Sequence, residues 1–349
     1  MPRTIKDVAN AANVSSATVS LVLNGKGDIS GATRARVLEA ASRLDYAPRA
    51  QRQPRAAEPV LGFLKIAKHG HTVNRDHSTF ISDYIDGMSS EAAKRGYRLE
   101  VVSHEGQSIR EIGQAMASPD LAACGLIVLG TELSEADVRM LGSLGPPKVF
   151  IDTYFEFLSD NFVNMDNHDA VHQVVRRLAA SGFRRIGFVA SYVETRNFQL
   201  RLDAFTQTMK ALGMPVRKGD VVQVDSTFEG AYRDMAAHLA RSVELPECFF
   251  CTNDIIALGC IRALREADRR IPDDVSIIGF DNLPMSATTE PPLTTVDISK
   301  RKIGNLAIAL LDDVLRSPDS QPPIKMLVGA SIVSRSSDVA AVRPVLSEA

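Results

Sequence analysis

The chain has 349 residues, 45% of them hydrophobic and 23% charged, which is enough for more than one globular domain. No apolar stretch approaches the ~20 residues of a membrane helix, and the start, Met1-Pro2-Arg3-Thr4, has no signal-peptide core, so we expect a cytoplasmic protein. The net charge of −2 conceals a basic head: residues 1–55 carry nine Lys/Arg and four Asp/Glu (+5), and the remainder carries 31 and 38 (−7).

Three short helices are predicted in the basic head. Thr4-Ile5-Lys6-Asp7 is typical of a capping box, and Ser15 and Ser30 stand where they would cap a second and a third helix. Apolar residues at helical spacing give the three helices a shared core. These residues are Ile5, Val8, Ala9, Ala12, Val19, Val22, Leu23, Val37, Ala41 and Leu44. We therefore predict an independent all-α domain over 1–48, followed by a polar, proline-punctuated linker or hinge over 49–59.

From residue 60 onward, short apolar runs alternate with amphipathic stretches. The predicted strands are 60–66, 99–102, 126–129, 149–151, 186–189, 221–224, 248–251 and 276–280, and the predicted helices lie near 80–95, 134–144, 168–181, 197–212, 229–242 and 254–267. This alternation predicts parallel, doubly wound α/β sheets. About 280 residues are better served by two lobes than by one core.

The four cysteines, Cys124, Cys248, Cys251 and Cys260, lie in or beside apolar runs. Cys248-x-x-Cys251 has the spacing of half a zinc site, but the sequence offers no second half nearby. We expect reduced core thiols, no metal site and no cofactor.

The second helix of the head presents small polar side chains to solvent. Hydroxyl groups at this density suit phosphate oxygens and the major groove of DNA. The outward residues are Ser15, Ser16, Ala17, Thr18, Ser20, Leu21 and Asn24. Periodicity alone leaves open a helical bundle that binds another protein.

The head resembles that of the lactose-repressor (LacI/GalR) family. The resemblance covers Thr4 to Asn24 (TIKDVANAANVSSATVSLVLN) and continues from Ser30 to Pro48 (SGATRARVLEAASRLDYAP). It implies a helix-turn-helix in which one set of residues contacts phosphates and another faces base edges. The phosphate contacts would be Ser15, Thr18, Ser20, Asn24 and Thr33, and the base-facing residues Ser16, Ala17 and Leu21.

Two positions depart from the family pattern. Leu21 stands where the family commonly has arginine, which removes a bidentate guanine contact worth about 1–3 kcal/mol. The linker lacks the leucine that the family wedges into the minor groove, and Pro54 disfavours helix there. We predict electrostatic DNA contacts by Arg49, Arg52 and Arg55 instead.

The body resembles the same family at lower density. The matching segments are 181–188 (SGFRRIGF), 252–259 (TNDIIALG), 271–282 (IPDDVSIIGFDN), 291–296 (PPLTTV) and 333–336 (VSRS). The resemblance implies a fold like that of periplasmic sugar-binding proteins over 60–340, with a ligand cleft between the lobes. We expect lobe N to comprise 60–161 and 291–324, and lobe C 162–290 and 325–340.

Four polar residues of the body are predicted to contact a ligand. Asp152, Asn253 and Asp281 each follow a predicted strand, and the resemblance adds Arg201 on a helix. Such groups suit the hydroxyls of a sugar, although Asp and Asn after strands also cap helices routinely. Phe80 and Phe155 are weaker candidates for apolar walls, since most phenylalanines pack the core.

The loop after the first strand is rich in cationic and imidazole side chains: Lys65, His69, His71, Arg75 and His77. Its simplest interpretation is a solvated polar loop. It could also bind an anionic sugar derivative, or form half a metal site at His69-x-His71.

Taken together, these features predict a homodimeric transcription regulator, a repressor of a sugar or sugar-acid operon, in which effector binding between the lobes alters operator affinity. A sugar-binding protein without a DNA role is the alternative. The sequence lacks the G-x-S-x-G, G-x-x-x-x-G-K-[ST], H-E-x-x-H and G-x-G-x-x-G motifs, so we do not expect an enzyme.

Overall fold

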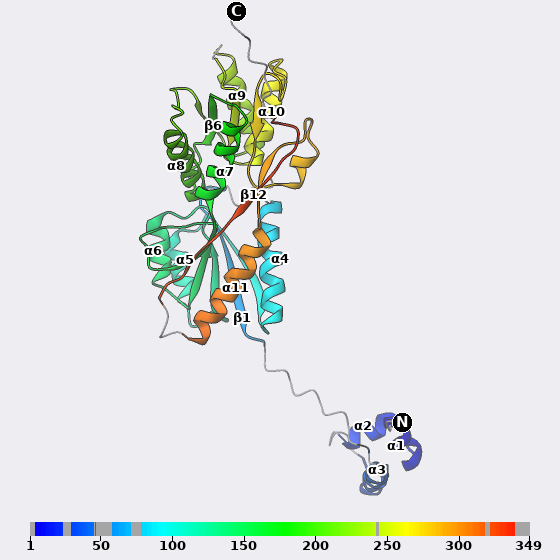
Figure 1. Ribbon diagram of the computed structural model, residues 1–349. Helices are drawn as coiled ribbons and strands as arrows, with labels where there is room; N and C mark the ends of the chain where they lie inside the picture. The colour runs from blue at the N-terminus through cyan, green and yellow to red at the C-terminus, as the bar shows by residue number, and fades with distance from the viewer. Residues whose placement is uncertain are drawn as a thin grey trace, which may run out of the picture. The chain divides into compact units, whose positions relative to one another are not determined.

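The computed structural model describes residues 4–23, 29–44, 46, 58–70, 78–241, 244–317 and 322–338. The chain divides into two units, Met1–Glu58 and Pro59–Ala349, which we call the head and the body and treat separately (Figure 1).

The head contains three helices, α1 (Ile5–Ala12), α2 (Ser16–Leu23) and α3 (Gly31–Arg43), among its described residues. Ser15 Oγ accepts a hydrogen bond from the backbone N of Thr18 at 3.1 Å, which starts α2, and Ser30 Oγ does the same for Thr33 at the start of α3. The three helices bury one small apolar core. Its buried members are Val8, Ala9, Ala12, Val19, Val22, Val37, Ala40 and Ala41.

The first lobe of the body, lobe N, is built on a six-stranded parallel sheet in the order β11-β5-β4-β3-β1-β2. One face of the sheet packs against α4 and α11 and the other against α5 and α6. The strands are β1 (Val60–Ala67), β2 (Arg98–Glu105), β3 (Ala123–Leu129), β4 (Lys148–Ile151), β5 (Asn161–Met165) and β11 (Lys325–Val328). The helices are α4 (Ser78–Lys94), α5 (Ile109–Met116), α6 (Glu135–Gly142) and α11 (Lys300–Arg316).

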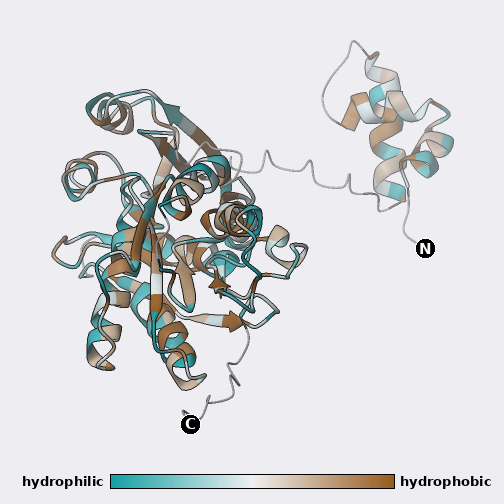
Figure 2. Ribbon diagram, turned by 90° about the horizontal axis from the view of Figure 1, so that it is seen from above, coloured by the Kyte–Doolittle hydropathy of each residue, from teal (hydrophilic) through white to brown (hydrophobic). Residues whose placement is uncertain are grey.

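The second lobe, lobe C, has a four-stranded parallel sheet in the order β7-β6-β8-β9. Helices α7 and α8 cover one face, α9 and α10 the other, and Figure 2 shows the hydrophobic residues concentrated on the enclosed strands. The strands are β6 (Ile186–Ser191), β7 (Val221–Val224), β8 (Cys248–Cys251) and β9 (Ser276–Ile278). The helices are α7 (Asn167–Ala180), α8 (Arg196–Ala211), α9 (Phe228–Leu239), α10 (Asp254–Glu266) and the 3₁₀ turn η2 (Pro284–Ala287).

The connections between the lobes differ from the predicted limits. Residues 162–165 and 325–328 were expected in lobe C, but β5 and β11 pair with each other in the lobe N sheet, so that expectation was wrong. The chain first crosses after Met165. The later crossings form a two-stranded antiparallel sheet of β10 (Thr295–Ile298) and β12 (Ala330–Val333), which runs from one lobe to the other (Figure 1).

Helices α4 and α11 lie in unusually close contact because each presents a glycine to the other. A Cβ on Gly304 would lie 2.5 Å from the backbone oxygen of Tyr84, and one on Gly87 would collide with the backbone of Arg301. Close approach of this kind requires the missing side chains. It fixes the two helices together, and with them Tyr84 and the first residue of α11, Lys300.

Cys248, Cys251 and Cys260 are buried in the core, as predicted, and are free thiols. Cys124, at the start of β3, is exposed, so the prediction that it is a core residue was wrong.

Candidate functional site

The described DNA-contact candidates of the head lie on the accessible side of α2 and at the start of α3. Ser15 and Ala17 are exposed, and Leu21 is 39% exposed in spite of its apolar side chain. Ser16, Thr18, Ser20 and Thr33 are partly exposed. A small polar surface at a helix N-terminus is suited to phosphate contacts. Asn24, Arg49, Arg52 and Arg55 lie outside the described residues.

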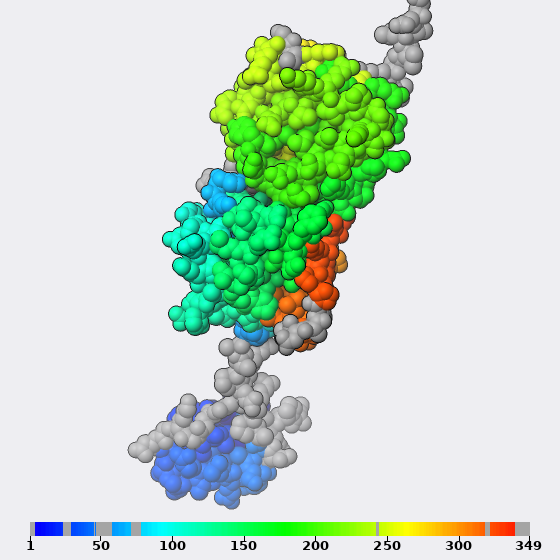
Figure 3. All heavy atoms as spheres, turned by 90° about the vertical axis from the view of Figure 1, so that its left-hand side faces the viewer, coloured from blue at the N-terminus to red at the C-terminus, as the bar shows by residue number. Residues whose placement is uncertain are grey.

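A cavity of about 30 Å³ lies between the two lobes of the body. Its lining contains five of the six predicted ligand residues, contributed by both lobes. The lining residues are Phe80, Ile81, Thr131, Asp152, Thr195, Asn197, Phe198, Arg201, Asn253 and Asp281. The volume holds one or two waters rather than a sugar, and the space-filling view shows the lobes in contact along their boundary (Figure 3).

Asp152 supplies a carboxylate from lobe N, directly after β4. Its Oδ1 accepts a hydrogen bond from the Tyr84 hydroxyl at 3.0 Å, and its Oδ2 accepts one from Thr131 Oγ1 at 2.5 Å. Burial raises the pKa of Asp152 to about 6, although the hydrogen bonds and the charge of Arg201 oppose the rise. The Asp152 carboxylate is therefore mostly ionised at pH 7 and becomes protonated as the pH falls through about 6.

Arg201 is the one cationic side chain among the described residues that line the cavity. Its guanidinium donates to Asn167 Oδ1 at 2.9 Å and to the Thr252 carbonyl at 2.7 Å, and it stacks 3.6 Å from the centre of the Phe280 ring. Arg201 Nη2 lies 3.7 Å from Asp281 Oδ1, beyond hydrogen-bond distance. The side chain is thus rigidly held in lobe C, with one carboxylate within reach but not hydrogen-bonded.

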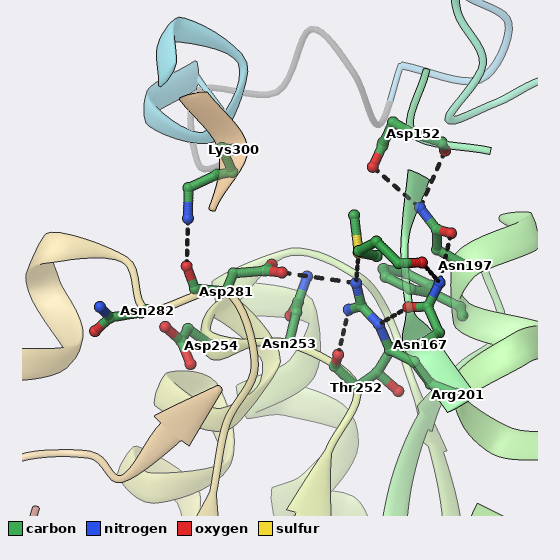
Figure 4. Close-up of polar contacts among 12 residues, drawn as sticks. Asp152, Asn167, Asn197, Arg201, Thr252, Asn253, Asp254, Asp281, Asn282 and Lys300 are labelled. Atoms are coloured by element: carbon green, nitrogen blue, oxygen red, sulfur yellow. Dashed lines mark hydrogen bonds and ion pairs between the residues drawn. The ribbon is translucent and has the colours of Figure 1, made fainter. Parts of the chain in front are cut away.

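Asp281 is the least satisfied group in the site. Its backbone has a φ of 108°, and its Oδ1 is buried without a hydrogen-bond partner among the described residues. Its carbonyl oxygen accepts from Lys300 Nζ of lobe N at 2.6 Å (Figure 4). A buried acceptor without a donor costs free energy unless a ligand or water satisfies it.

Asn253 combines the two roles that the sequence left open. Its Oδ1 accepts from the backbone N of Ile256 at 2.9 Å and so caps α10. The same side chain lines the cavity.

Phe155 does not line this cavity. It lies in a separate pocket of about 490 Å³ at the outer edge of the lobe boundary, where the guanidinium of Arg196 is 5.5 Å from its ring centre. Phe80 does line the inner cavity, with Lys300 Nζ 5.3 Å from its ring centre. The structure therefore separates the two predicted aromatic walls.

Sequence reasoning missed several residues of the site, among them Tyr84, Asn197 and Lys300. Tyr84 lies within the predicted helix near 80–95, among apolar residues that pack the core, and Lys300 begins α11, which was not predicted, so nothing in the sequence singled out either residue. Asn197 precedes Arg201 by four residues, one helical turn, and that spacing alone could have indicated a second cavity-facing side chain.

The histidine-rich loop is described only in part. His69 Nδ1 lies 3.3 Å from Glu132 Oε2, at the outer pocket, whereas His71, Arg75 and His77 lie outside the described residues. Within the described ranges no group of three or more His, Cys, Asp or Glu is arranged to hold a metal ion, and no helix there combines the length and apolar character needed to cross a membrane.

Comparison with known proteins decides the family. Residues 4–49 match the lacI family of bacterial regulatory proteins, and residues 175–337 match the periplasmic binding protein-like domain. The HTH-type transcriptional repressor CytR of Escherichia coli K12 is 30% identical over 328 residues, 90% of each chain. This chain belongs to the LacI family. It is a DNA-binding transcriptional repressor with a ligand-binding domain, which confirms the predicted resemblance and fold class.

Other relatives agree with this LacI-family assignment. The repressor PurR of Photobacterium profundum is 28% identical over 309 residues, covering 88% of this chain and 90% of that protein. The solved complex of the regulator CelR with cellobiose has a TM-score of 0.71 at 24% identity, with 96% of this chain and 99% of that one covered. The Lac repressor dimer bound to operator and the anti-inducer ONPF has a TM-score of 0.71 at 23% identity, with coverage of 97% and 99%. The two structures support the fold.

Proposed function

We propose that this LacI-family repressor acts in the cytoplasm as a homodimer, and that a sugar or sugar derivative bound between its lobes changes its affinity for a two-half-site operator. The single observation that carries the effector site is the buried Oδ1 of Asp281, which has no hydrogen-bond partner in the described part of the chain. It lies at a cavity whose lining also includes Asp152, Arg201 and Asn253. Hydroxyl groups of a ligand would donate to the two carboxylates and accept from the guanidinium.

The charges on the cavity favour a neutral effector. Asp152 and Asp281 bring two carboxylates into the site, and the guanidinium of Arg201 together with the nearby ammonium of Lys300 balances them. An effector with a carboxylate or phosphate would add a third negative charge to a buried site, which is costly without a further cation. We therefore put neutral sugars ahead of the sugar acids that the His-rich loop suggested.

The effector must also open the lobes. A cavity of about 30 Å³ is far below the 300–1,000 Å³ of ordinary ligand pockets. Effector binding thus stabilises a more open arrangement of lobes N and C than the one described here. That difference is what a dimer would transmit to its two heads.

Two apolar surfaces support a homodimer. Strand β2 is an exposed edge strand on which Val101 and Val102 are 46% and 41% exposed, and an unprotected edge of this kind needs a partner. Lobe C carries a groove of about 660 Å³ lined by Phe228, Leu258 and Ile261, beside Met285, which is 49% exposed. Sedimentation velocity should give a dimer, and a monomer at micromolar concentration would contradict this part of the proposal.

Thermal shift assays with matched neutral sugars, amino sugars and sugar acids test the effector class. A ligand at 100 times its Kd should raise stability by about 2.7 kcal/mol. Asp281→Asn should abolish the shift from any positive compound, whereas Asp268→Asn, on the surface of the same lobe, should retain it. Binding of genomic DNA fragments with and without that compound then tests the regulatory role. A protein with no sequence preference under any of these conditions would overturn the proposal.

A further inference from the structure

A continuous hydrogen-bond chain joins the lobe N half of the site to the lobe C half (Figure 4). Asn197 Nδ2, on α8 of lobe C, donates to both the carbonyl oxygen and Oδ1 of Asp152 in lobe N, at 3.0 Å each. Asn197 Oδ1 accepts from Asn167 Nδ2 at 2.9 Å, and Asn167 Oδ1 accepts from Arg201 Nε at 2.9 Å. Asn164 Nδ2, from β5 at the crossing, donates to the same Asn197 Oδ1 at 2.8 Å.

The two ends of this chain fix its direction. Arg201 can only donate, so the oxygen of Asn167 must face it and the amide nitrogen of Asn167 must face Asn197. The carboxylate of Asp152 can only accept, so Asn197 must turn its nitrogen toward it. The orientation of both amides is therefore set by the charged residues at the two ends of a buried network.

We propose that Asn197 is the positioning residue that joins the two halves of the effector site: it orients Asp152 and holds the lobes closed until a ligand competes for that carboxylate. The proposal rests on the proposed function only in naming Asp152 as an effector contact. Closure itself follows from the geometry, because Asn197 and Asp152 lie on different lobes and meet through two hydrogen bonds shielded from water. An effector hydroxyl that takes Asp152 Oδ1 removes one of these two bonds.

Replacing Asn197 by aspartate removes the hydrogen-bond donor that faces Asp152. Asn197→Asp keeps the oxygen that accepts from Asn167 but replaces the donor with a carboxylate oxygen facing Asp152. At neutral pH, repulsion between two ionised carboxylates at this separation disfavours the closed arrangement. In acid, a proton shared between the two carboxylates restores a hydrogen-bond donor. The variant should therefore open at neutral pH and close again in acid. The other groups that face the pair are Arg201 on α8, Asp281 after β9 and the Tyr84 hydroxyl on α4.

Energy transfer between two dyes, one on each lobe, measures closure without any effector. Cysteines would be introduced at Arg139 on α6 and Gln207 on α8, both exposed, in a Cys124→Ser background, and labelled protein mixed with excess unlabelled protein to avoid transfer between subunits. Wild type should show high transfer at pH 7.5 and at pH 5. Asn197→Asp should shift the open–closed equilibrium by about tenfold or more toward open at pH 7.5 and return to the wild-type value at pH 5.

Two further variants complete the test. Asn197→Ala should be open at both pH values, because no proton restores its donor, and it serves alone if the aspartate variant does not fold. Gln199→Glu adds the same charge two residues further along α8 and should behave as wild type. Low transfer in the wild type, a closed Asn197→Ala, or an aspartate variant that does not respond to pH would each overturn the proposal. Because the energy-transfer experiment contains no effector, such a failure would not bear on the proposed effector site, which the thermal shift assays test separately.

Discussion

Lys300 Nζ, at the first residue of α11, donates a hydrogen bond to the backbone carbonyl oxygen of Asp281 at 2.6 Å. A buried lysine of lobe N thus binds the residue of lobe C whose carboxylate Oδ1 lacks a hydrogen-bond donor among the described residues. The contact holds the backbone of Asp281 rather than its side chain, which leaves Oδ1 available to a ligand. Lys300 and Asn197 thus both make hydrogen bonds across the lobe boundary, one on each side of the site.

Replacing Lys300 by methionine should destabilise the body by about 1–3 kcal/mol, because it leaves a buried carbonyl without its donor. The measurement is denaturant unfolding at pH 7.5. Lys302→Met, at an exposed position on the same helix, should change stability by less than about 0.5 kcal/mol. Equal effects of the two variants would show that the Lys300 contact does not stabilise the fold.

Stability should fall as the pH rises from about 4 to 8, through Asp152 and Asp254 up to about pH 6 and through Asp254 alone above it. Burial raises the pKa of Asp152 to about 6, and burial together with the charge of Asp281 raises the pKa of Asp254 to about 8. Both values exceed the ordinary 3.8, so the folded chain holds protons that the unfolded chain has released, and the stability they contribute is lost as pH rises to each folded pKa.

Asp254→Asn tests the sign of this dependence. Asp254 should contribute a slope of about 1.4 kcal/mol per pH unit between its unfolded and folded pKa, and the amide removes that titration. Between pH 6 and 8 the free energy of unfolding of the variant should therefore fall less steeply than that of wild type. Parallel curves would contradict the raised pKa of Asp254.

Gly304→Ala should destabilise the body by about 1–3 kcal/mol, because its Cβ would lie 2.5 Å from the backbone oxygen of Tyr84 and would force α4 and α11 apart. Gly329→Ala is the matched control, since a Cβ there meets no atom within 4 Å. Thermal unfolding compares the two. If Gly304→Ala unfolds at the same temperature as wild type, the close contact of α4 and α11 is not required for stability.

Leu21→Ala should weaken binding to a selected operator by about 1 kcal/mol or more relative to random DNA, while stability stays within about 0.5 kcal/mol because the side chain is already 39% exposed. Fluorescence anisotropy at fixed salt provides the measurement. Leu38→Ala, at a 49% exposed position on α3, should change neither quantity. An unaltered ratio of operator to random affinity would exclude Leu21 from sequence recognition.

The sequence predicted the strongly periodic parts of the fold well. Its eight apolar runs coincide with β1 to β4 and β6 to β9. Most of these are buried parallel strands, which are nearly continuous hydrophobic segments, whereas β2 is an exposed edge strand. Strand β5 was missed since Asn161 and Asn164 interrupt its apolar pattern. Strands β10, β11 and β12 have only four residues each, and β11 and β12 are partly exposed. Helix α11 was overlooked although Ile303, Ala307 and Leu311 recur at helical spacing.

The candidate site was predictable only where a residue type follows a strand or matches the family. Asp152, Asn253 and Asp281 were found in this way, and the structure brings them to one cavity with Arg201. Lys300 and Asn197 could not be singled out from one sequence, because their partners are a backbone oxygen 19 residues away and a carboxylate 45 residues away. Contacts of that kind depend on how the two lobes close.

The pairing of β10 with β12 limits how the lobes can move. If the two later crossing segments were not paired with each other, lobe C could slide, tilt and rotate relative to lobe N with little restriction. Joined edge to edge by an antiparallel ladder, they form one ribbon that resists stretching and shear along its length but bends readily across it. The β10–β12 ribbon therefore acts as a hinge between lobes N and C. Every effector that binds between the lobes must drive the same bending motion about it.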